Sequence, residues 1–406
     1  MPAASYAVKR DVRHFSLYKK NKSPFLRQLT LELTERCNLD CIHCYINLPA
    51  GDRCAAAQEL STETIKRILR EAAALGCLEL CFTGGEPLLR KDFETIYVFA
   101  REHGFRVVLF TNATLISPRW AKLFREIPTL GSIEVTVYGM SPSSYEAVTR
   151  TPGSFAAARR GIDLLLRHKV PFLVKGALLP SNKAEVKGFE RWSSSVPGMD
   201  HPPLFAKFFD LRCRRDAPQR NAAIMSVRLS PEEVVAFLVR KKKTYLRSLY
   251  KSCRAFKRLP GRVLFRCPHQ RLGGWVSSNG HLQICAQLRR SGCVYDLKKG
   301  NLAVALKKFF PSLMERRTAR AAYLARCGRC FLSAFCMQCP GRSWMEHGTL
   351  DTPIDYYCGI AHAEARYWGL IRGGEKGWEV RDWKLRLARF CRMAEKEWAN
   401  LKDTAA

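Results

Sequence analysis

The chain has 406 residues, 47% of them hydrophobic, which is enough for two or three domains with buried cores. No apolar run approaches the ~20 residues that span a bilayer, and the basic N-terminus lacks the apolar core of a signal peptide, so the sequence predicts a cytoplasmic protein and excludes a membrane-spanning one. With 68 Lys and Arg against 36 Asp and Glu, the formal charge is +32, which favours an acidic peptide, a nucleic acid or an anionic membrane surface as a partner, or else reflects a solvated surface with no dedicated partner.

The cysteine content bears on metal binding. Seventeen cysteines are more than an ordinary cytosolic enzyme carries, and because the number is odd, complete disulfide pairing is impossible. In a reducing compartment such residues are more often metal ligands than disulfide partners. The composition therefore predicts metal sites.

Residues 1–27 are basic and weakly patterned and are interpreted as an N-terminal arm. From residue 28 to 225, strand and helix patterns alternate, and the six predicted strands cover 29–33, 78–82, 107–112, 133–137, 170–179 and 203–212. Helix ends are marked by Ser61 as an N-cap with Gly76 after the last turn, and by Ser117-Pro118. Six strand–helix units joined by right-handed crossovers predict an α/β fold, a partial (β/α)6 parallel barrel with its chemistry at the C-terminal ends of the strands.

The pattern changes after residue 225. Residues 226–262 are predicted to form a basic helical bridge that begins at the cap Ser230. Residues 263–360 are predicted to form a small cysteine-rich α+β domain. Residues 361–406 are predicted to form C-terminal helices that pack through their tryptophans.

Three cysteines follow the first predicted strand with the spacing C-x3-C-x2-C, at Cys37, Cys41 and Cys44. Three thiolates can hold three irons of a cubane cluster and leave the fourth iron open. Taken alone, the triplet could also bind zinc or be accidental. Together with the strand before it and the motifs after it, the triplet resembles the radical S-adenosylmethionine (SAM) superfamily. In that family the open iron of a [4Fe-4S] cluster chelates SAM, and an electron cleaves SAM to a 5′-deoxyadenosyl radical.

The resemblance extends to the loops after the second and third predicted strands. Gly84, Gly85 and Glu86, followed by a proline, match the GGEP motif, which binds the SAM amino group. Glycines allow the backbone to approach a ligand closely. Asn112 ends the third predicted strand, where relatives often carry T-N-G near the SAM ribose or carboxylate. This chain has Ala113 in place of that glycine.

Two further SAM contacts are implied by the resemblance. His43 directly precedes the third cysteine, at a position that is usually aromatic and packs on the adenine; the alternative is a polar loop residue. Arg150 follows the fourth predicted strand, where family members often place an arginine against the SAM carboxylate; the alternative is a surface arginine. Tyr138 departs from the S-x-D-G pattern of many relatives, in which an acid contacts the ribose.

A second group of cysteines lies between residues 267 and 358. Cys267 is followed by Gly280 and Cys285, and then by a C-x2-C-x5-C-x2-C run and a last cysteine. This pattern resembles the seven-cysteine SPASM domain, which holds two auxiliary [4Fe-4S] clusters, although the usual last pair is separated by three residues and here by two. Taken alone, two C-x2-C pairs could also be a zinc site.

The resemblance to the SPASM domain also implies how these ligands are shared. The outer cluster is assigned to Cys327, Cys330, Cys336 and Cys358. The inner cluster is assigned to Cys267, Cys285 and Cys339, with Cys253 as the nearby candidate for a fourth ligand. The alternative is an open iron at the inner cluster, which could ligate a substrate thiolate.

By resemblance, SPASM enzymes mostly modify peptides, and the predicted function is a radical SAM oxidoreductase that oxidises or crosslinks a ribosomally made precursor. Its expected partners are that peptide, for which the charge favours an acidic leader, and an electron donor such as flavodoxin or ferredoxin. Ala286 replaces the general-base aspartate of sulfatase-maturating relatives, and no catalytic base is assigned. One alternative is an enzyme acting on a small molecule or cofactor precursor. Another is a basic iron–sulfur protein that binds nucleic acid, which explains the charge but not the GGEP motif.

Overall fold

The computed structural model describes residues 26–252, 259–266 and 273–403. The chain divides into two compact units. The first unit comprises Met1–Arg228 and Cys267–Leu313, and the second comprises Leu229–Arg266 and Met314–Ala406. Among the described residues, no helix is both long and apolar enough to cross a bilayer.

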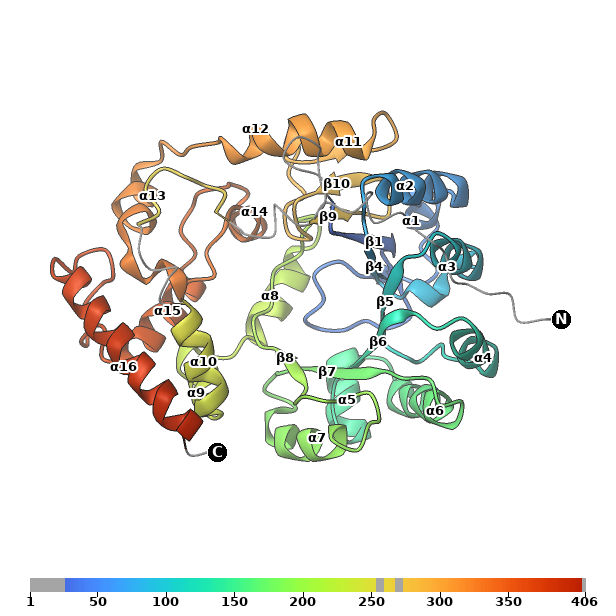
Figure 1. The fold of residues 1–406 in the computed structure, drawn as a ribbon, viewed down its shortest axis with the longest axis horizontal. Helices are drawn as coiled ribbons and strands as arrows, with labels where there is room; N and C mark the ends of the chain where they lie inside the picture. The colour runs from blue at the N-terminus through green and yellow to red at the C-terminus, as the bar shows by residue number, and fades with distance from the viewer. Residues whose placement is uncertain (1–25, 253–258, 267–272, 404–406) are drawn as a thin grey trace. The chain divides into compact units, whose positions relative to one another are not determined.

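The first unit is built on a nine-stranded sheet (Figure 1). In sheet order its strands are β11 (Tyr295–Asp296), β10 (His281–Gln283), β9 (Gly273–Val276), β1 (Gln28–Thr34), β4 (Glu79–Gly84), β5 (Arg106–Thr111), β6 (Leu130–Val137), β7 (Leu173–Ala177) and β8 (Leu204–Ala206). From β9 through β1 to β8 every neighbouring pair is parallel, and β10 and β11 are antiparallel to their neighbours. A separate parallel pair joins β2 (Arg36–Cys37) to β3 (Leu48–Pro49).

The six predicted strands are β1 and β4 to β8, in the predicted order, and the mostly parallel α/β fold is confirmed. Among the described residues the sheet stays open, because β8 and β11 each pair with one neighbour, as expected of a partial barrel. Strands β7 and β8 are shorter than predicted. β8 keeps only three residues of the predicted strand 203–212.

Helices of the first unit lie along the outer side of the curved sheet, where Figure 1 shows α2, α3, α4 and α6 side by side. The helices of this unit are α1 (Arg53–Gln58), α2 (Thr62–Ala74), α3 (Phe93–Glu102), α4 (Pro118–Glu126), α5 (Pro142–Thr149), α6 (Ser154–Arg167), α7 (Val186–Ser193), α8 (Pro218–Ser226) and α11 (Leu302–Val304). Ser61 and Ser117 cap α2 and α4 as predicted. Neither α5 nor α8 was predicted from the sequence.

Part of the cysteine-rich segment 263–360 extends the first sheet, because β9 pairs in parallel with β1 from Gln28 to Leu31. The rest of that segment lies in the second unit. Backbone pairing between distant segments carries no local sequence signal, so the sequence offered no reason to divide the segment. The predicted domain boundaries stay a prediction.

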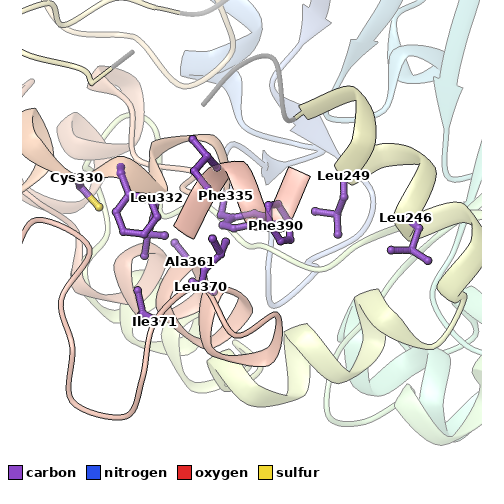
Figure 2. Close-up of a cluster of buried hydrophobic side chains, with 12 residues drawn as sticks. Leu246, Leu249, Cys330, Leu332, Phe335, Ala361, Leu370, Ile371 and Phe390 are labelled. Carbon is purple, nitrogen blue, oxygen red and sulfur yellow. The ribbon is translucent and has the colours of Figure 1, made fainter. Parts of the chain in front are cut away.

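The second unit is helical. It contains α9 (Pro231–Val239), α10 (Lys242–Ser252), α13 (Ala321–Ala325), α14 (Pro340–His347), α15 (Asp355–Tyr367) and α16 (Trp383–Asp403), with the short 3-10 helices η8 (Cys327–Arg329) and η9 (Phe331–Ala334). Helix α12 (Phe310–Met314) belongs to the first unit except for its last residue. Its core packs α10, α15 and α16 around Leu332, Phe335 and Phe390 (Figure 2). Cys330 lies at one end of this apolar cluster, beside Leu332.

Candidate functional site

The three cysteines after β1 lie on one short loop. Cys37 ends β2, and Cys41 and Cys44 occupy the turn that follows, where the Cys44 N–H donates to the Cys41 carbonyl at 3.1 Å. All three are free thiols, with Cys41 buried and the other two half-buried. A loop placed at the C-terminal end of a parallel strand is where this class of sheet builds its sites.

The C-terminal turn of α5 holds this loop from one side. The Asp40 N–H donates to the Thr149 carbonyl at 3.0 Å, and the Ile42 N–H donates to the Val148 carbonyl at 2.9 Å. These bonds satisfy carbonyls that the end of a helix leaves without partners. Helix α5 was not predicted from the sequence because it is only eight residues long and weakly amphipathic.

Arg150 holds the same loop through its side chain. It caps α5 in the left-handed conformation, with φ of 51°, and its Nε donates to the Asp40 carbonyl at 2.8 Å. Its Nη2 pairs with the Asp40 carboxylate at 2.5 Å, and Arg220 of α8 pairs with the other oxygen of that carboxylate. Arg150 thus lies beside the cysteine loop. The predicted contact to the SAM carboxylate stays a prediction.

The glycines of the GGEP motif lie against the backbone that leads into Cys37. The Gly85 N–H donates to the Thr34 carbonyl at 2.8 Å, and the Glu86 N–H donates to the Arg36 carbonyl at 2.9 Å. A Cβ on Gly84 would come 2.1 Å from the Thr34 oxygen, and one on Gly85 would come 2.0 Å from the Arg36 oxygen. Only glycine permits this approach, so both glycines position the cysteine loop.

The Glu86 carboxylate is fully buried and bonded within the protein. It accepts from the Thr111 hydroxyl at 2.9 Å, from the Asn112 N–H at 2.8 Å and from the Leu88 N–H at 3.2 Å. Burial raises the pKa of this carboxyl to about 7, although the three hydrogen bonds oppose the shift. The carboxylate therefore joins the loop after β4 to the end of β5. A contact to the SAM amino group stays a prediction.

Asn112 lies beside the first cysteine. Its Nδ2 donates to Asn38 Oδ1 at 3.1 Å and lies 3.8 Å from Cys37 Sγ, which also accepts the Leu39 N–H at 3.4 Å. Ala113 follows with φ of 61°, a conformation that favours glycine. The backbone of the T-N-G pattern is thus kept without its glycine.

His43 packs between two aromatic rings. Its ring centroid lies 5.5 Å from that of Tyr138 and 4.8 Å from that of Phe209. Burial lowers the pKa of His43 to about 4, so the ring is neutral at pH 7, and its buried Nδ1 has no hydrogen-bond partner among the described residues. A buried ring nitrogen without a partner, next to three thiols, fits a site that takes a polar ligand.

The donor set of this loop fits an iron–sulfur cluster. Burial raises the pKa of Cys37 to about 12, and the Glu86 carboxylate adds to the shift. A thiol with such a pKa needs nearby positive charge to become a thiolate ligand, and metal ions supply it. In the described part of the chain, no three Cys, His, Asp or Glu side chains are placed to hold a single metal ion. A cubane core stands between its ligands and so needs them farther apart.

The four predicted outer ligands come together in the second unit. Cys327 starts η8, Cys330 follows it, Cys336 follows η9, and Cys358 lies on α15. Burial raises the pKa of Cys327 to about 11 and that of Cys330 to about 12, and in both thiols the charge of Cys358 adds to the shift. The charges of Cys327, Cys330 and Cys358 likewise add to the rise in the pKa of Cys336. Cys336 Sγ lies 4.0 Å from the carbonyl oxygen of Tyr357, which precedes Cys358, and the side chain of Arg326, which precedes Cys327, lies 3.8 Å from Cys358 Sγ.

The predicted inner ligands are distributed differently. Cys285 follows β10 in the first unit, whereas Cys339 is in the second unit, where it caps α14 and its Sγ accepts the Arg342 N–H at 3.5 Å. Cys253 and Cys267 lie outside the described residues. The inner cluster stays a prediction.

A buried charge network that sequence reasoning missed lies beside the same end of β1. The Arg289 guanidinium donates to both oxygens of Glu32, at 2.7 and 2.5 Å, and also pairs with Glu35. The Trp275 indole N–H donates to Glu32 at 2.7 Å, and Arg214 pairs with Glu35. Charged residues scattered along a sequence carry no spacing signal, so only the fold brings these groups together.

A family model and two curated relatives each match part of the chain. Residues 31–192 match the family model of the Radical SAM superfamily. The chain is 36% identical over 149 residues to the Fe-coproporphyrin III synthase of Methanosarcina barkeri, covering 37% of this chain and 35% of that protein. It is 45% identical over 89 residues to the PqqA peptide cyclase of Rhodopseudomonas palustris, covering 21% of this chain and 22% of that protein. The chain thus spans about a third or less of the length of these relatives.

A solved structure shares the fold over most of the chain. It is native anSMEcpe with bound AdoMet and the Cp18Cys peptide, with a TM-score of 0.53 and 17% identity, covering 92% of this chain and all of the other. At this identity the likeness concerns the fold alone.

Proposed function

We propose, on the premise that residues 31–192 form a radical SAM domain, that this protein is an enzyme that cleaves SAM reductively. Its reaction is the oxidation or crosslinking of a ribosomally made peptide. In this proposal Cys37, Cys41 and Cys44 hold the SAM-binding [4Fe-4S] cluster. When bound, this cluster and SAM supply a 5′-deoxyadenosyl radical that takes a hydrogen atom from the substrate.

The observation that carries the proposal is the double attachment of the cysteine loop. Gly84 and Gly85 bring the loop after β4 against the backbone before Cys37, and α5 accepts the N–H groups of Asp40 and Ile42. The loop is thus fixed from two sides before any ligand binds, which is how a site holds reacting groups in one geometry. His43 and Asn112 line the same loop, and with the backbone of the glycine turn they would contact SAM.

The auxiliary clusters are part of the proposal. Cys327, Cys330, Cys336 and Cys358, all of which belong to the second unit, would hold one cluster. The other would use Cys285 and Cys339 with the predicted Cys253 and Cys267. Their roles would be to take an electron from the substrate or to anchor it.

A peptide substrate is supported by two comparisons and by the charge. One relative is named as a peptide cyclase, and the solved structure of similar fold holds a peptide. A net charge of +32 favours a peptide with an acidic leader. An electron donor such as flavodoxin or ferredoxin would complete the system.

A second candidate is an enzyme that acts on a tetrapyrrole or another small cofactor precursor. It is favoured by the identity of 36% to the Fe-coproporphyrin III synthase. The two candidates are distinguished by their substrate. The correct substrate is modified in the same reaction that forms 5′-deoxyadenosine.

The site is tested by iron content and SAM cleavage. Anaerobically reconstituted protein is expected to carry about twelve irons per chain, four for each of three clusters. Replacing Cys37, Cys41 and Cys44 with Ala is expected to remove about four irons and all 5′-deoxyadenosine formation. Cys54→Ala, an exposed thiol of α1, is the matched control and should change neither. Continued 5′-deoxyadenosine formation by the triple variant would show that the site is wrong.

The second unit and the substrate need separate tests. Cys336→Ala is expected to remove about four irons while 5′-deoxyadenosine still forms, and Cys391→Ala, a thiol of α16, is its control. A wild-type count near four irons would contradict the auxiliary clusters. Co-expression with a short peptide encoded beside the gene, followed by mass spectrometry, should show a loss of about 2 Da for each oxidation or crosslink. An unmodified peptide beside a modified tetrapyrrole would favour the second candidate.

A further inference from the structure

We propose that Arg326 and His362 donate hydrogen bonds to the sulfur of Cys358 and thereby raise the reduction potential of the cluster that the second unit would hold. This inference rests on the proposed function, because it requires a [4Fe-4S] cluster at Cys327, Cys330, Cys336 and Cys358. Hydrogen bonds and positive charge at a ligand sulfur stabilise the reduced, more negative state of a cluster and so raise its potential.

The hydrogen bonds of His362 fix which ring nitrogen carries the proton. The backbone N–H of Gly377 donates to His362 Nε2 at 3.0 Å, so Nε2 is an acceptor and Nδ1 is the donor. Nδ1 lies 2.8 Å from the Cys358 carbonyl oxygen and 3.5 Å from Cys358 Sγ. The Nδ1 proton is therefore shared between the Cys358 carbonyl oxygen and the sulfur, and because the histidine is 6% exposed, water does not compete for it.

Arg326 approaches the same sulfur from a different segment. Its Nη2 lies 3.8 Å from Cys358 Sγ and 2.7 Å from a carboxylate oxygen of Asp355. Its guanidinium stacks over the Trp378 ring at 5.0 Å from the centroid, and the same ring lies 5.3 Å from that of His362. Asp355 and Trp378 thus hold the charged group beside the thiol.

One donor of Arg326 has no use within the described protein. Its Nε is buried and has no hydrogen-bond partner among the described residues. A buried donor without an acceptor is unfavourable, and Arg326 immediately precedes the predicted ligand Cys327. An acceptor at this place, such as a sulfur of the cluster, would satisfy it.

Gly377 connects this arrangement to another ligand. A Cβ on Gly377 would come 2.8 Å from Cys330 Sγ and 2.7 Å from Leu332, so the chain that orients His362 also packs directly on Cys330. Figure 2 shows Cys330 beside Leu332 at the end of the apolar core. The segment around Gly377 therefore packs on one predicted ligand, Cys330, and orients His362, which lies beside another, Cys358.

Cys336 and Cys358 differ in the kind of donor that reaches their sulfur atoms. Cys336 Sγ accepts a backbone N–H, from Gln338 at 3.4 Å, as does Cys37 in the first unit from Leu39. Cys358 is approached by two side chains. Because side chains can be replaced without moving the main chain, the contribution of these donors to the potential can be measured.

The test is a redox titration of the auxiliary clusters in full-length reconstituted protein, followed by electron paramagnetic resonance. Cys37, Cys41 and Cys44 are replaced with Ala in every sample so that the SAM-site cluster does not contribute. Arg326→Leu removes charge and donors, and Arg326→Lys keeps the charge. His362→Gln keeps an acceptor for the Gly377 N–H and removes the donor at Nδ1. Arg329→Leu removes an exposed charge from the same turn and is the matched control.

Arg326→Leu and His362→Gln are each expected to move the midpoint of one cluster signal to more negative potential than Arg329→Leu does, with unchanged iron content. Arg326→Lys should keep most of the wild-type value, and the signal of the other auxiliary cluster should not move. Midpoints equal to that of Arg329→Leu would overturn the inference. If Arg326→Leu loses iron, His362→Gln decides alone.

The proposed function and the role of Arg326 and His362 can be contradicted separately. A parent protein that holds zinc in the second unit, or no auxiliary iron, would overturn the proposed function and the inference with it. A parent protein with both auxiliary clusters, whose potentials do not respond to these variants, would overturn the inference alone.

Discussion

The Glu86 carboxylate accepts the backbone N–H of Asn112 at 2.8 Å, and this bond joins the loop after β4 to the end of β5. Glu86 also donates its own N–H to the Arg36 carbonyl, directly before Cys37, while the Asn112 side chain lies 3.8 Å from Cys37 Sγ. Motifs that lie 75 residues apart in the sequence are thus one hydrogen-bonded unit around the cysteine loop.

Glu86 gives the protein a predictable dependence on pH. Its folded-state pKa of about 7 lies above its ordinary value of 4.5, so between these values the folded state keeps a proton that the unfolded state loses. Stability contributed by the neutral carboxyl is present below pH 4.5 and is lost as the pH rises to 7. The free energy of unfolding of wild type, relative to Glu86→Gln, should fall by about 3 kcal/mol across this window.

The measurement is urea unfolding of both proteins at pH 5 and pH 8 in the same metallation state. Taking the difference cancels groups that titrate equally in the two proteins. A difference that is constant with pH, or that grows as the pH rises, would contradict the assignment.

Gly85→Ala tests the close approach of the glycine loop. The new Cβ would lie 2.0 Å from the Arg36 carbonyl oxygen, so the segment before Cys37 must move. SAM binding, measured by equilibrium dialysis, should weaken at least about tenfold, or ~1.4 kcal/mol. Gly188→Ala is the control, because that glycine lies in α7 with no atom near its Cβ position, and it should bind SAM normally and unfold at slightly higher denaturant. Equal SAM affinity in the two variants would contradict a role of Gly85 in positioning the cysteine loop.

Arg289→Met leaves the fully buried Glu32 carboxylate without its ion-pair partner. Breaking a buried pair in this way costs about 3–5 kcal/mol, to be measured by denaturant unfolding. Arg119→Met breaks an exposed pair with Glu94 and should cost about 1 kcal/mol or less. The double variant Glu32→Gln with Arg289→Met should recover much of the loss, because the amide keeps an acceptor for Trp275. Additive losses in the double variant would show that the two groups do not interact.

Asp40→Asn distinguishes two roles for Arg150. If Arg150 acts by holding the cysteine loop through Asp40, then Asp40→Asn and Arg150→Leu should weaken SAM binding by similar factors, about tenfold each, and the double variant should be no worse than either. If Arg150 acts only by contacting SAM, Asp40→Asn will bind SAM as wild type does. Arg125→Leu, an exposed arginine of α4, is the control.

The basic surface is tested by ionic strength. Exposed charges are screened beyond ~10 Å at 0.1 M salt, so an acidic leader peptide should bind more weakly at 0.5 M than at 0.05 M salt in fluorescence anisotropy. A neutral peptide of the same length should bind weakly at both. Binding of the acidic peptide that does not change with salt would show that the charge of +32 is not used to recognise it.

Features with a local cause were determined by the sequence. Alternation at Leu29, Leu31 and Leu33 gives β1 because side chains on a strand alternate between its two faces. The caps Ser61 and Ser117 start α2 and α4 because their hydroxyls accept N–H groups three residues ahead. The cysteine spacing and the glycine pair are likewise contiguous in the chain, so the elements around the site could be named without the fold.

Features that depend on distant partners were decided only by the tertiary structure. The sequence provides Arg150, but its bond to Asp40 spans 110 positions, and the Arg289–Glu32 pair spans 257. The pairing of β9 with β1 and the docking of the cysteine loop on α5 are main-chain hydrogen bonds, which any residue except proline can donate and which therefore leave no mark in the sequence. The sequence named the groups that hold the site, and the fold determined which of them meet.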